Sequence, residues 1–197
     1  MNNLISIKKI SKSFSNNKKV TVLKNIDYSF AKGKIYSLMG PSGSGKSTLL
    51  NILSMIDKPT TGLLLIGGDK IDFNDSIVND KIRSKKIGII YQQNNLLPDF
   101  TALENVYLAR LALSNDKKNS IQKAKKIIKE MGLTSREHHY PSELSGGEMQ
   151  RIAMARALIN EPEIILADEP TGSLDQTTAK EVFNVLYNLK NKNRLII

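Results

Sequence analysis

The sequence predicts an α/β fold with a largely parallel sheet, and two observations support this prediction. Apolar segments of strand length, such as 63–66, 87–91 and 164–167, alternate along the chain with helical patterns. Strands that are apolar throughout are typical of sheets covered on both faces, which is where parallel strands occur. We therefore expect helices packed on a sheet.

Length and composition fit one ordinary globular domain. The chain has 197 residues, of which 40% are hydrophobic and 24% charged. It contains no cysteine, which excludes a disulfide framework, a cysteine-ligated zinc site and a thiol nucleophile. No apolar run approaches the roughly 18 residues of a membrane-spanning helix, and residues 1–10 lack the apolar core of a signal peptide. We expect the protein to stay in the compartment where it is made.

The net charge of +10 leaves two interpretations open. The lysines are dispersed, mostly as pairs such as Lys85-Lys86, in a chain that is also rich in Ile and Asn. This pattern favours a solvated basic surface that reflects composition. Contact with an anionic membrane or polymer remains the alternative.

The expected elements begin with two strands, 4–10 and 20–30, around a polar turn at 15–18, which together form an N-terminal antiparallel part. A short buried strand at 34–39 then leads through a glycine-rich loop into a helix whose apolar positions run to Ile56 and which Pro59 closes. A polar helical insertion follows from about 101 to 131, with one apolar face. The remaining expected elements are helices at 147–159 and 175–189, and strands at 164–167 and 195–197.

The strongest motif is the segment 40–47, which matches G-x-x-x-x-G-K-[ST] between the expected strand and helix. Its glycines allow successive backbone N–H groups to face phosphate oxygens, and the helix N-terminus adds partial positive charge. Lys46 would bridge the β- and γ-phosphates, and the Ser47 hydroxyl would ligate Mg²⁺. A chance glycine-rich turn is the alternative. The predicted nucleotide-binding residues here are Gly40, Pro41, Ser42, Gly43, Ser44, Gly45, Lys46, Ser47 and Thr48.

Two carboxylates, Asp168 and Glu169, follow the apolar strand 164–167. By itself such a pair would simply open a loop. Beside a phosphate loop, however, a strand end is where an acid that orients Mg²⁺ belongs. Asp168 suits the metal shell, and Glu169 suits the general base that polarises the attacking water.

The segment 144–151, Leu-Ser-Gly-Gly-Glu-Met-Gln-Arg, resembles the signature sequence of ATP-binding cassette (ABC) ATPases. As plain structure, Ser145 would only cap the helix that follows it. Phe14 resembles the aromatic residue on which adenine stacks in that family, with core packing as the alternative. Gln92 resembles the family's glutamine that senses Mg²⁺ and the membrane partner, although Gln93 beside it leaves the assignment ambiguous.

The resemblance implies one ABC ATP-binding domain over residues 1–197, a P-loop NTPase core with a helical signature subdomain at about 93–160. It implies an ATP hydrolase that uses ATP and Mg²⁺, with catalytic residues Glu169, Lys46 and Gln92 and metal-shell residues Ser47, Gln92 and Asp168. Two copies would sandwich two ATP molecules, with Pro170 and 173–175 in the loop that crosses the dimer. The signature residues that would contact the nucleotide are Ser145, Gly146, Gly147 and Glu148.

One departure from the family concerns its switch histidine, which follows the strand after the 175–189 helix. In this sequence that strand is 195–197, and the two histidines, His138 and His139, both precede the signature. We therefore expect the C-terminus to be truncated relative to the family. ATP binding should persist because its residues lie upstream, whereas the consequence for hydrolysis is left to experiment.

Within the family, residues 94–106 together with 167–175 resemble the ATPase of bacterial lipoprotein-releasing transporters. This implies membrane subunits as partners and a peripheral location at the cytoplasmic face of the inner membrane. The alternatives are the ATPases of macrolide or peptide efflux and of cell division, and, from another class, a soluble ABC ATPase acting on nucleic acid. The single cassette without cysteines or long insertions argues against the last, so no specific nucleic-acid partner is expected.

Overall fold

The computed structural model describes residues 3–16 and 18–197, so Asn17 of the expected turn and the first two residues lie outside the described part. The chain divides into two compact units, each described here by itself. One comprises Met1–Arg83 and Lys190–Ile197, and the other comprises Ser84–Leu189. The expected single domain with an inserted helical subdomain at 93–160 stays a prediction.

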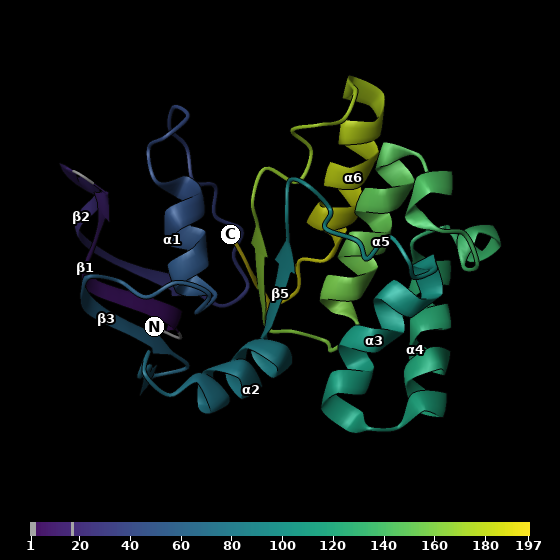
Figure 1. Cartoon of the computed structure of the whole chain (residues 1–197), viewed down its shortest axis with the longest axis horizontal. Coiled ribbons are helices and arrows are strands. Elements are labelled where there is room, and N and C mark those ends of the chain that lie inside the picture. Colours follow the sequence, from purple (N-terminus) through teal and green to yellow (C-terminus); the bar gives the residue numbers. More distant parts are fainter. Residues whose placement is uncertain (1–2, 17) are drawn as a thin grey trace. The chain divides into compact units, whose positions relative to one another are not determined.

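The first unit contains a four-stranded antiparallel sheet in the order β2-β1-β3-β4 (Figure 1). This confirms the expected antiparallel part, with strands longer than the sequence indicated. The long β1–β2 pair contains register shifts on both sides of Ile10, which bend the ribbon. The strands are β1 (Asn3–Asn16), β2 (Lys18–Ala31), β3 (Thr61–Ile66) and β4 (Asp69–Lys70).

The prediction of a buried strand at 34–39 is wrong. Only Ile35 forms a bridge, to Ile196 of β7 (Leu195–Ile196), and Ile35 and Met39 are 40% and 90% exposed. The pairing of this segment with β7 consists of two backbone bonds, from the Tyr36 N–H to the Ile196 carbonyl and from the Ile196 N–H to the Lys34 carbonyl. The rest of the segment continues as a loop into residues 40–45.

Helix α1 (Lys46–Leu53) confirms the helix after the glycine-rich loop but ends earlier than expected. Ser54 is its C-cap and Met55 has a φ of +59°, so the helix cannot continue and Ile56 is 49% exposed rather than buried. Helix α2 (Ser76–Lys86) was not predicted. Its apolar residues are only Ile77, Val78 and Ile82, and the first two are exposed, so the apolar spacing is too sparse to predict a helix.

The second unit contains the parallel pair β5 (Ile87–Ile90) and β6 (Ile164–Ala167), in register from Ile87 with Ile164 to Ile90 with Ala167. Both strands lie where they were expected. Four helices accompany them: α3 (Ala102–Ser114), α4 (Lys117–Glu130), α5 (Gly146–Leu158) and α6 (Gln176–Asn188). Two short 3₁₀ turns, η1 (Thr134–Arg136) and η2 (Pro141–Glu143), join α4 to α5.

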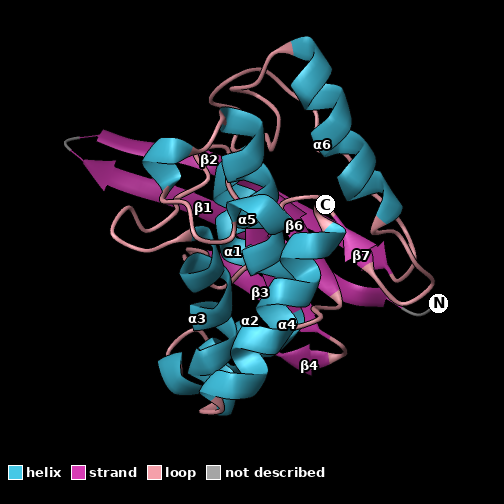
Figure 2. Cartoon of the chain, turned by 90° about the vertical axis from the view of Figure 1, so that its right-hand side faces the viewer, coloured by secondary structure: helices cyan, strands magenta, loops and turns pink. Residues whose placement is uncertain are grey.

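Helix α5 packs on α3, α4, α6 and on β5, and α3 also packs on α4 (the helices are labelled in Figure 2). The expected helical insertion at 101–131 is a hairpin of α3 and α4, whose buried face includes Ala124 and Ile128. A Cβ on Gly88 of β5 would lie 2.4 Å from the Ala157 carbonyl oxygen, so α5 approaches the strand at backbone distance. Antiparallel sheet, parallel strands and covering helices together confirm the α/β prediction.

Among the described residues, no helix combines the length and the apolar character that crossing a bilayer requires.

Candidate functional site

The phosphate-loop motif forms an exposed turn that ends in the left-handed conformation. Ser42, Gly43 and Ser44 are exposed, and the Ser44 N–H donates to the Pro41 carbonyl at 3.2 Å. Gly45 has a φ of +92°, and a Cβ there would lie 2.9 Å from a Leu23 methyl group of β2. Both facts require glycine at this position, because an L side chain would be strained and would collide.

Helix α1 begins without a side-chain cap, unlike the long helices of the second unit. Its N-cap is Gly45, whereas α3, α5 and α6 are capped by the side chains of Thr101, Ser145 and Asp175. The first N–H groups of a helix have no partner within the helix, and here no N-cap side chain takes them up. Their partial positive charge would therefore suit an anion such as the phosphates of a nucleotide.

Lys46 folds back over this loop. Its Nζ donates to the carbonyl oxygens of Gly40 at 3.0 Å and Pro41 at 3.2 Å. Ser47, the predicted Mg²⁺ ligand, is exposed in the first turn of the same helix. The amine and the hydroxyl thus lie at the uncapped helix end, where a β- or γ-phosphate with its Mg²⁺ would need them.

Phe14, the predicted adenine platform, lies on β1 and is 44% exposed. Its alternative interpretation as a core residue is therefore wrong. The ring is among the exposed large apolar side chains of the first unit, which suits a residue that stacks on a ligand.

The two predicted acids follow β6, as expected. The Asp168 N–H extends the strand pairing by donating to the Ile90 carbonyl at 2.9 Å. Glu169 is exposed and has a φ of +44°, an uncommon conformation for a residue with a side chain. The strand pairing therefore extends to Asp168, and the chain leaves the strand at Glu169.

Gln92 lies beside the loop that follows these acids. Its Nε2 would be 3.1 Å from a Cβ built on Gly172, whose N–H donates to the Glu169 carbonyl at 2.9 Å. The structure therefore brings together Gln92 and the turn at Glu169, two groups that the sequence analysis assigned to the reaction.

The signature motif begins helix α5 as a complete capping box. The Ser145 hydroxyl accepts from the Glu148 N–H at 3.3 Å, and the Glu148 carboxylate accepts from the Ser145 N–H at 2.8 Å. The capping interpretation of Ser145 is thus correct as structure. It does not exclude a ligand role, because a hydroxyl that accepts one hydrogen bond can still donate its own proton.

Arg136 of η1 completes the environment of Glu148 by donating from Nε to the carboxylate at 2.8 Å. Hydrogen bonds from the Ser145 N–H and from Arg136 lower the pKa of Glu148 from its ordinary 4.5 to about 2. The side chain of Glu148 is 17% exposed, and its negative charge is stabilised by hydrogen bonds from the Ser145 N–H and the Arg136 Nε. Its assignment as a nucleotide contact stays a prediction.

This lowered pKa predicts how stability changes with pH. A carboxylate whose pKa is depressed by folding stabilises the protein above its unfolded pKa, and this contribution is lost as the pH falls from about 4.5 to 2. Because Arg136 is 42% exposed, we expect roughly 1–2 kcal/mol. Urea unfolding should show Glu148→Gln less stable than wild type at pH 7, with the difference vanishing near pH 2. A difference that is constant with pH, or one shared by Glu130→Gln in α4, would contradict the assignment.

Gly147 has a packing role that its place in the signature did not suggest. It is buried, and a Cβ there would lie 2.3 Å from the Thr178 Cγ2 of α6. The close approach of α5 to α6 therefore requires glycine at 147, independently of any contact to phosphate.

We expect Gly147→Ala to lower the free energy of unfolding by about 1–3 kcal/mol, because the added methyl group overpacks this helix crossing. Thermal unfolding without nucleotide measures the effect. Thr178→Ser removes the opposing methyl group, so the double variant Gly147→Ala/Thr178→Ser should recover most of the loss. A double variant no more stable than Gly147→Ala would refute the proposed clash.

Sequence analysis missed three polar side chains that hold the loop after β5. Gln150, 2% exposed, donates to the Tyr91 carbonyl, and Arg156 donates to the carbonyls of Asn94 and Asn95 at 2.7 and 2.6 Å. Asn105, 1% exposed, donates to three carbonyls of residues 97–101. Residues 91–101 have almost no secondary structure, so these bonds supply their order. A helical pattern gives no sign of these bonds. Gln150 and Arg156 lie 59 to 62 residues from their partners, whereas Asn105 lies within 8 residues of its own.

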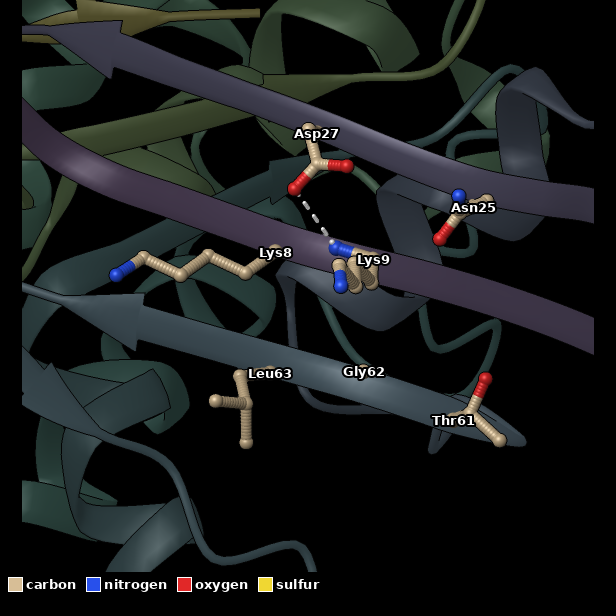
Figure 3. A pocket seen from close by; sticks show the side chains of 7 residues that line it. All are labelled: Lys8, Lys9, Asn25, Asp27, Thr61, Gly62 and Leu63. Atoms are coloured by element: carbon tan, nitrogen blue, oxygen red, sulfur yellow. Dashed lines mark hydrogen bonds between the residues drawn. The ribbon is translucent and has the colours of Figure 1, made fainter.

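A hollow of about 540 Å³ lies on the antiparallel sheet between β1, β2 and β3 (Figure 3). It forms where Lys9 and Asn25 both have a φ of +52°, and the Asp27 carboxylate accepts the Lys9 N–H at 3.0 Å. Its lining is of mixed charge, and none of the predicted site residues contributes to it. The hollow is explained by the strand irregularity and is separate from the phosphate loop.

Comparison with known proteins agrees with these features. Residues 23–172 match the ABC transporter family. The chain is 44% identical over 198 residues to the lipoprotein-releasing system ATP-binding protein LolD of Rickettsia bellii (strain RML369-C), covering 100% of this chain and 87% of the relative. It is 43% identical over 189 residues to the protein of the same name from Bacteroides fragilis (strain YCH46), covering 96% and 86%.

Solved structures give the same result. The dimeric post-hydrolysis state of the ATP-binding cassette MJ0796 bound to ADP and Pi superposes with a TM-score of 0.89 at 38% identity, covering 98% of this chain and 86% of that one. A dimeric structure of the same bacterial ABC transporter cassette gives a TM-score of 0.88 at 40% identity, with the same coverage. From its motifs, its fold and these relatives, the chain belongs to the ABC transporter family, as an ATP-binding cassette.

Proposed function

We propose that this chain is the ATP-binding and ATP-hydrolysing subunit of a bacterial ABC transporter that releases lipoproteins from the inner membrane. The observation that carries the proposal is its similarity, at 43–47% identity over nearly the whole chain, to proteins named for lipoprotein release. The uncapped helix end at the phosphate loop supports nucleotide binding independently of that name.

In this proposal the residues predicted from the sequence bind ATP and its metal ion. The N–H groups of the phosphate loop and the Lys46 amine bind the β- and γ-phosphates, and Phe14 stacks on the adenine. Ser47, Asp168 and Gln92 would hold Mg²⁺, which neutralises charge on the phosphates when bound. These are oxygen donors, the kind that Mg²⁺ prefers, and the nucleotide supplies the other ligands.

Hydrolysis needs a base in line with the γ-phosphate, and we assign that role to Glu169. A carboxylate there accepts a proton from the attacking water, Lys46 stabilises charge on the phosphate oxygens, and Gln92 orients the water and the metal. The left-handed turn at Glu169 supports the assignment, since strained backbone is concentrated at functional positions.

The working form in this proposal is a dimer of two copies. Ser145, Gly146 and Gly147 of one copy would face the γ-phosphate bound by the other, with the Ser145 hydroxyl donating to it. Pro170 and residues 173–175 would cross between the copies. Support comes from MJ0796, whose cassette was solved as a dimer with ADP and Pi. Loss of the γ-phosphate would remove these contacts and let the copies separate.

The membrane subunits would dock on residues 94–106, at the cytoplasmic face of the membrane. Leu97 and Phe100 are 45% and 39% exposed. Hydrogen bonds from Asn105 and Arg156 fix the backbone of this segment, which suits a rigid docking surface. Efflux of macrolides or peptides and cell division remain the alternatives within the family.

Depletion of the chain in its own cells tests the proposal. We expect lipoproteins to be retained in the inner membrane, and the tagged chain to sediment with membranes only while its membrane subunits are present. Normal lipoprotein sorting with macrolide sensitivity or filamentation instead would point to one of the sister functions. Salt-dependent retention on DNA or RNA, without membrane association, would refute the transporter proposal.

A further inference from the structure

Lys12 of β1 is a buried lysine that lies against the face of Phe14. The residue is 8% exposed, and its Nζ lies 4.9 Å from the centroid of the Phe14 ring. This distance is within the range of a cation–π interaction. Lysines are seldom buried to this degree without a defined partner, so the contact needs an explanation.

The amine of Lys12 is held in place by the segment that follows the phosphate-loop helix. It donates to the Asp57 carboxylate at 2.6 Å and to the Lys58 carbonyl at 2.8 Å. The same carboxylate oxygen accepts from the Lys58 N–H at 2.8 Å, and the Asp57 N–H donates to the carbonyl of Asn51 in α1. The position of the cation is therefore tied to the end of α1.

A second set of bonds fixes the backbone of β1 around this lysine. The Thr60 N–H donates to the Ser11 carbonyl at 2.8 Å, and the Ser13 N–H donates to the Thr60 hydroxyl at 2.9 Å. Strand β1 is thus held on both sides of Lys12 by the residues after α1. Phe14 follows on the same strand, with its ring beside the amine of Lys12.

A cation on one face of an aromatic ring affects what binds on the other. It limits the rotation of the ring, and it draws electron density away from the exposed side, which favours stacking with an electron-rich purine. Phe14 is 44% exposed, so ring surface remains for a ligand although Lys12 lies against one face.

We propose that Lys12 is a positioning residue for base recognition, which sets the Phe14 ring for adenine and links it through Asp57 to the end of the phosphate-loop helix. The inference rests on the proposed function, in which Phe14 stacks on the base. It adds that the base platform is connected, through Lys12 and Asp57, to the C-terminal end of the helix that follows the phosphate loop.

The test compares two ligands, Mg²⁺-ATP and Mg²⁺-tripolyphosphate, because tripolyphosphate has the phosphates but lacks the base. Dissociation constants of the purified full chain are measured by calorimetry for wild type, Lys12→Met, Lys12→Arg, Phe14→Ala and Lys12→Met/Phe14→Ala. We expect Lys12→Met to weaken ATP binding about 3- to 10-fold and to leave tripolyphosphate binding within about 2-fold. Lys12→Arg should remain close to wild type, and Lys12→Met should have no further effect once Phe14 is alanine.

Equal losses for both ligands in Lys12→Met would overturn the inference, since they would mean a general defect of the fold or of the phosphate loop. An unchanged ATP affinity, or a loss that persists in the Phe14→Ala background, would also overturn it. If Lys12→Met does not fold, Asp57→Asn decides the question. It leaves the lysine, an acceptor oxygen at position 57 and the Lys58 carbonyl, but it removes the negative charge that holds the amine. We expect it to weaken ATP binding by about 2- to 3-fold and to leave tripolyphosphate binding unchanged.

The same measurements separate this inference from the proposed function. If the wild-type chain binds neither ATP nor tripolyphosphate, both the proposed function and this inference are refuted. ATP binding that is insensitive to Phe14→Ala would leave nucleotide binding intact and refute the role of the ring, and with it the role of Lys12.

Discussion

Lys46→Ala is expected to abolish ATP binding at millimolar nucleotide while leaving the fold unchanged. The amine is the only cation in the motif 40–47, and in the free protein it donates to two carbonyls of an exposed loop, which water can satisfy when the side chain is removed. The phosphates would lose a charge-assisted contact that neutral N–H groups cannot replace. We expect affinity for Mg²⁺-ATP to fall by about 100-fold or more, which corresponds to roughly 3 kcal/mol.

Thermal unfolding measures this effect directly. At a nucleotide concentration of about 100 times Kd, binding stabilises the folded state by about 2.7 kcal/mol. For a chain of this size, that shifts Tm by roughly 5–10 °C in wild type, and Lys46→Ala should show no shift. Lys34→Ala, in the loop before the motif, is a matched control that should show the same ATP-dependent shift of Tm as wild type. If ATP stabilises Lys46→Ala as strongly as wild type, the assignment of the phosphate loop is wrong.

Glu169→Gln is expected to separate binding from hydrolysis. The amide cannot accept the proton of the attacking water, and loss of a general base costs about 10²- to 10⁴-fold in rate. Glutamine keeps the size of the side chain and the same φ of +44°, so the fold and the affinity for ATP should not change. We expect Mg²⁺-dependent phosphate release by wild type to exceed clearly that of Glu169→Gln, and ATP to hold the variant as a dimer in size-exclusion chromatography.

Asp168→Asn provides the contrast. The side chain assigned to the Mg²⁺ shell should affect nucleotide affinity in the presence of Mg²⁺, whereas Glu169→Gln should not. Glu130→Gln, an exposed carboxylate on α4, controls for the loss of a charge and should behave as wild type. Phosphate release by Glu169→Gln equal to wild type, with wild type active, would exclude Glu169 as the base.

Elements with a strong local pattern were predicted well. The strands at 87–90 and 164–167, the signature helix and the helices of the 101–131 insertion lie within a few residues of their expected bounds. The predictions that were wrong depended on partners. The segment 34–39 is apolar enough for a strand but forms a single bridge, between Ile35 and Ile196. Ile56 fits the helical period but follows a residue in the left-handed region.

The site residues also divide into those that a local pattern predicts and those that depend on distant partners. A fixed spacing of glycine, lysine and serine is enough to predict a phosphate loop, because its chemistry uses backbone N–H groups that lie next to one another in the chain. The partners of Gln150, Arg156 and Lys12 lie 45 to 62 residues away, on elements whose meeting depends on packing. No local pattern carries that information.

The family, the nucleotide motif, the two acids and the signature could be predicted from the sequence, because each is a short run of residues whose chemistry is local. The tertiary structure decided which glycine is required by packing, that Glu148 is held ionised between Ser145 and Arg136, and that Lys12 lies against Phe14. The physical reason is that the burial of a charge and the collision of a methyl group depend on segments brought together by folding, and not on neighbours along the chain.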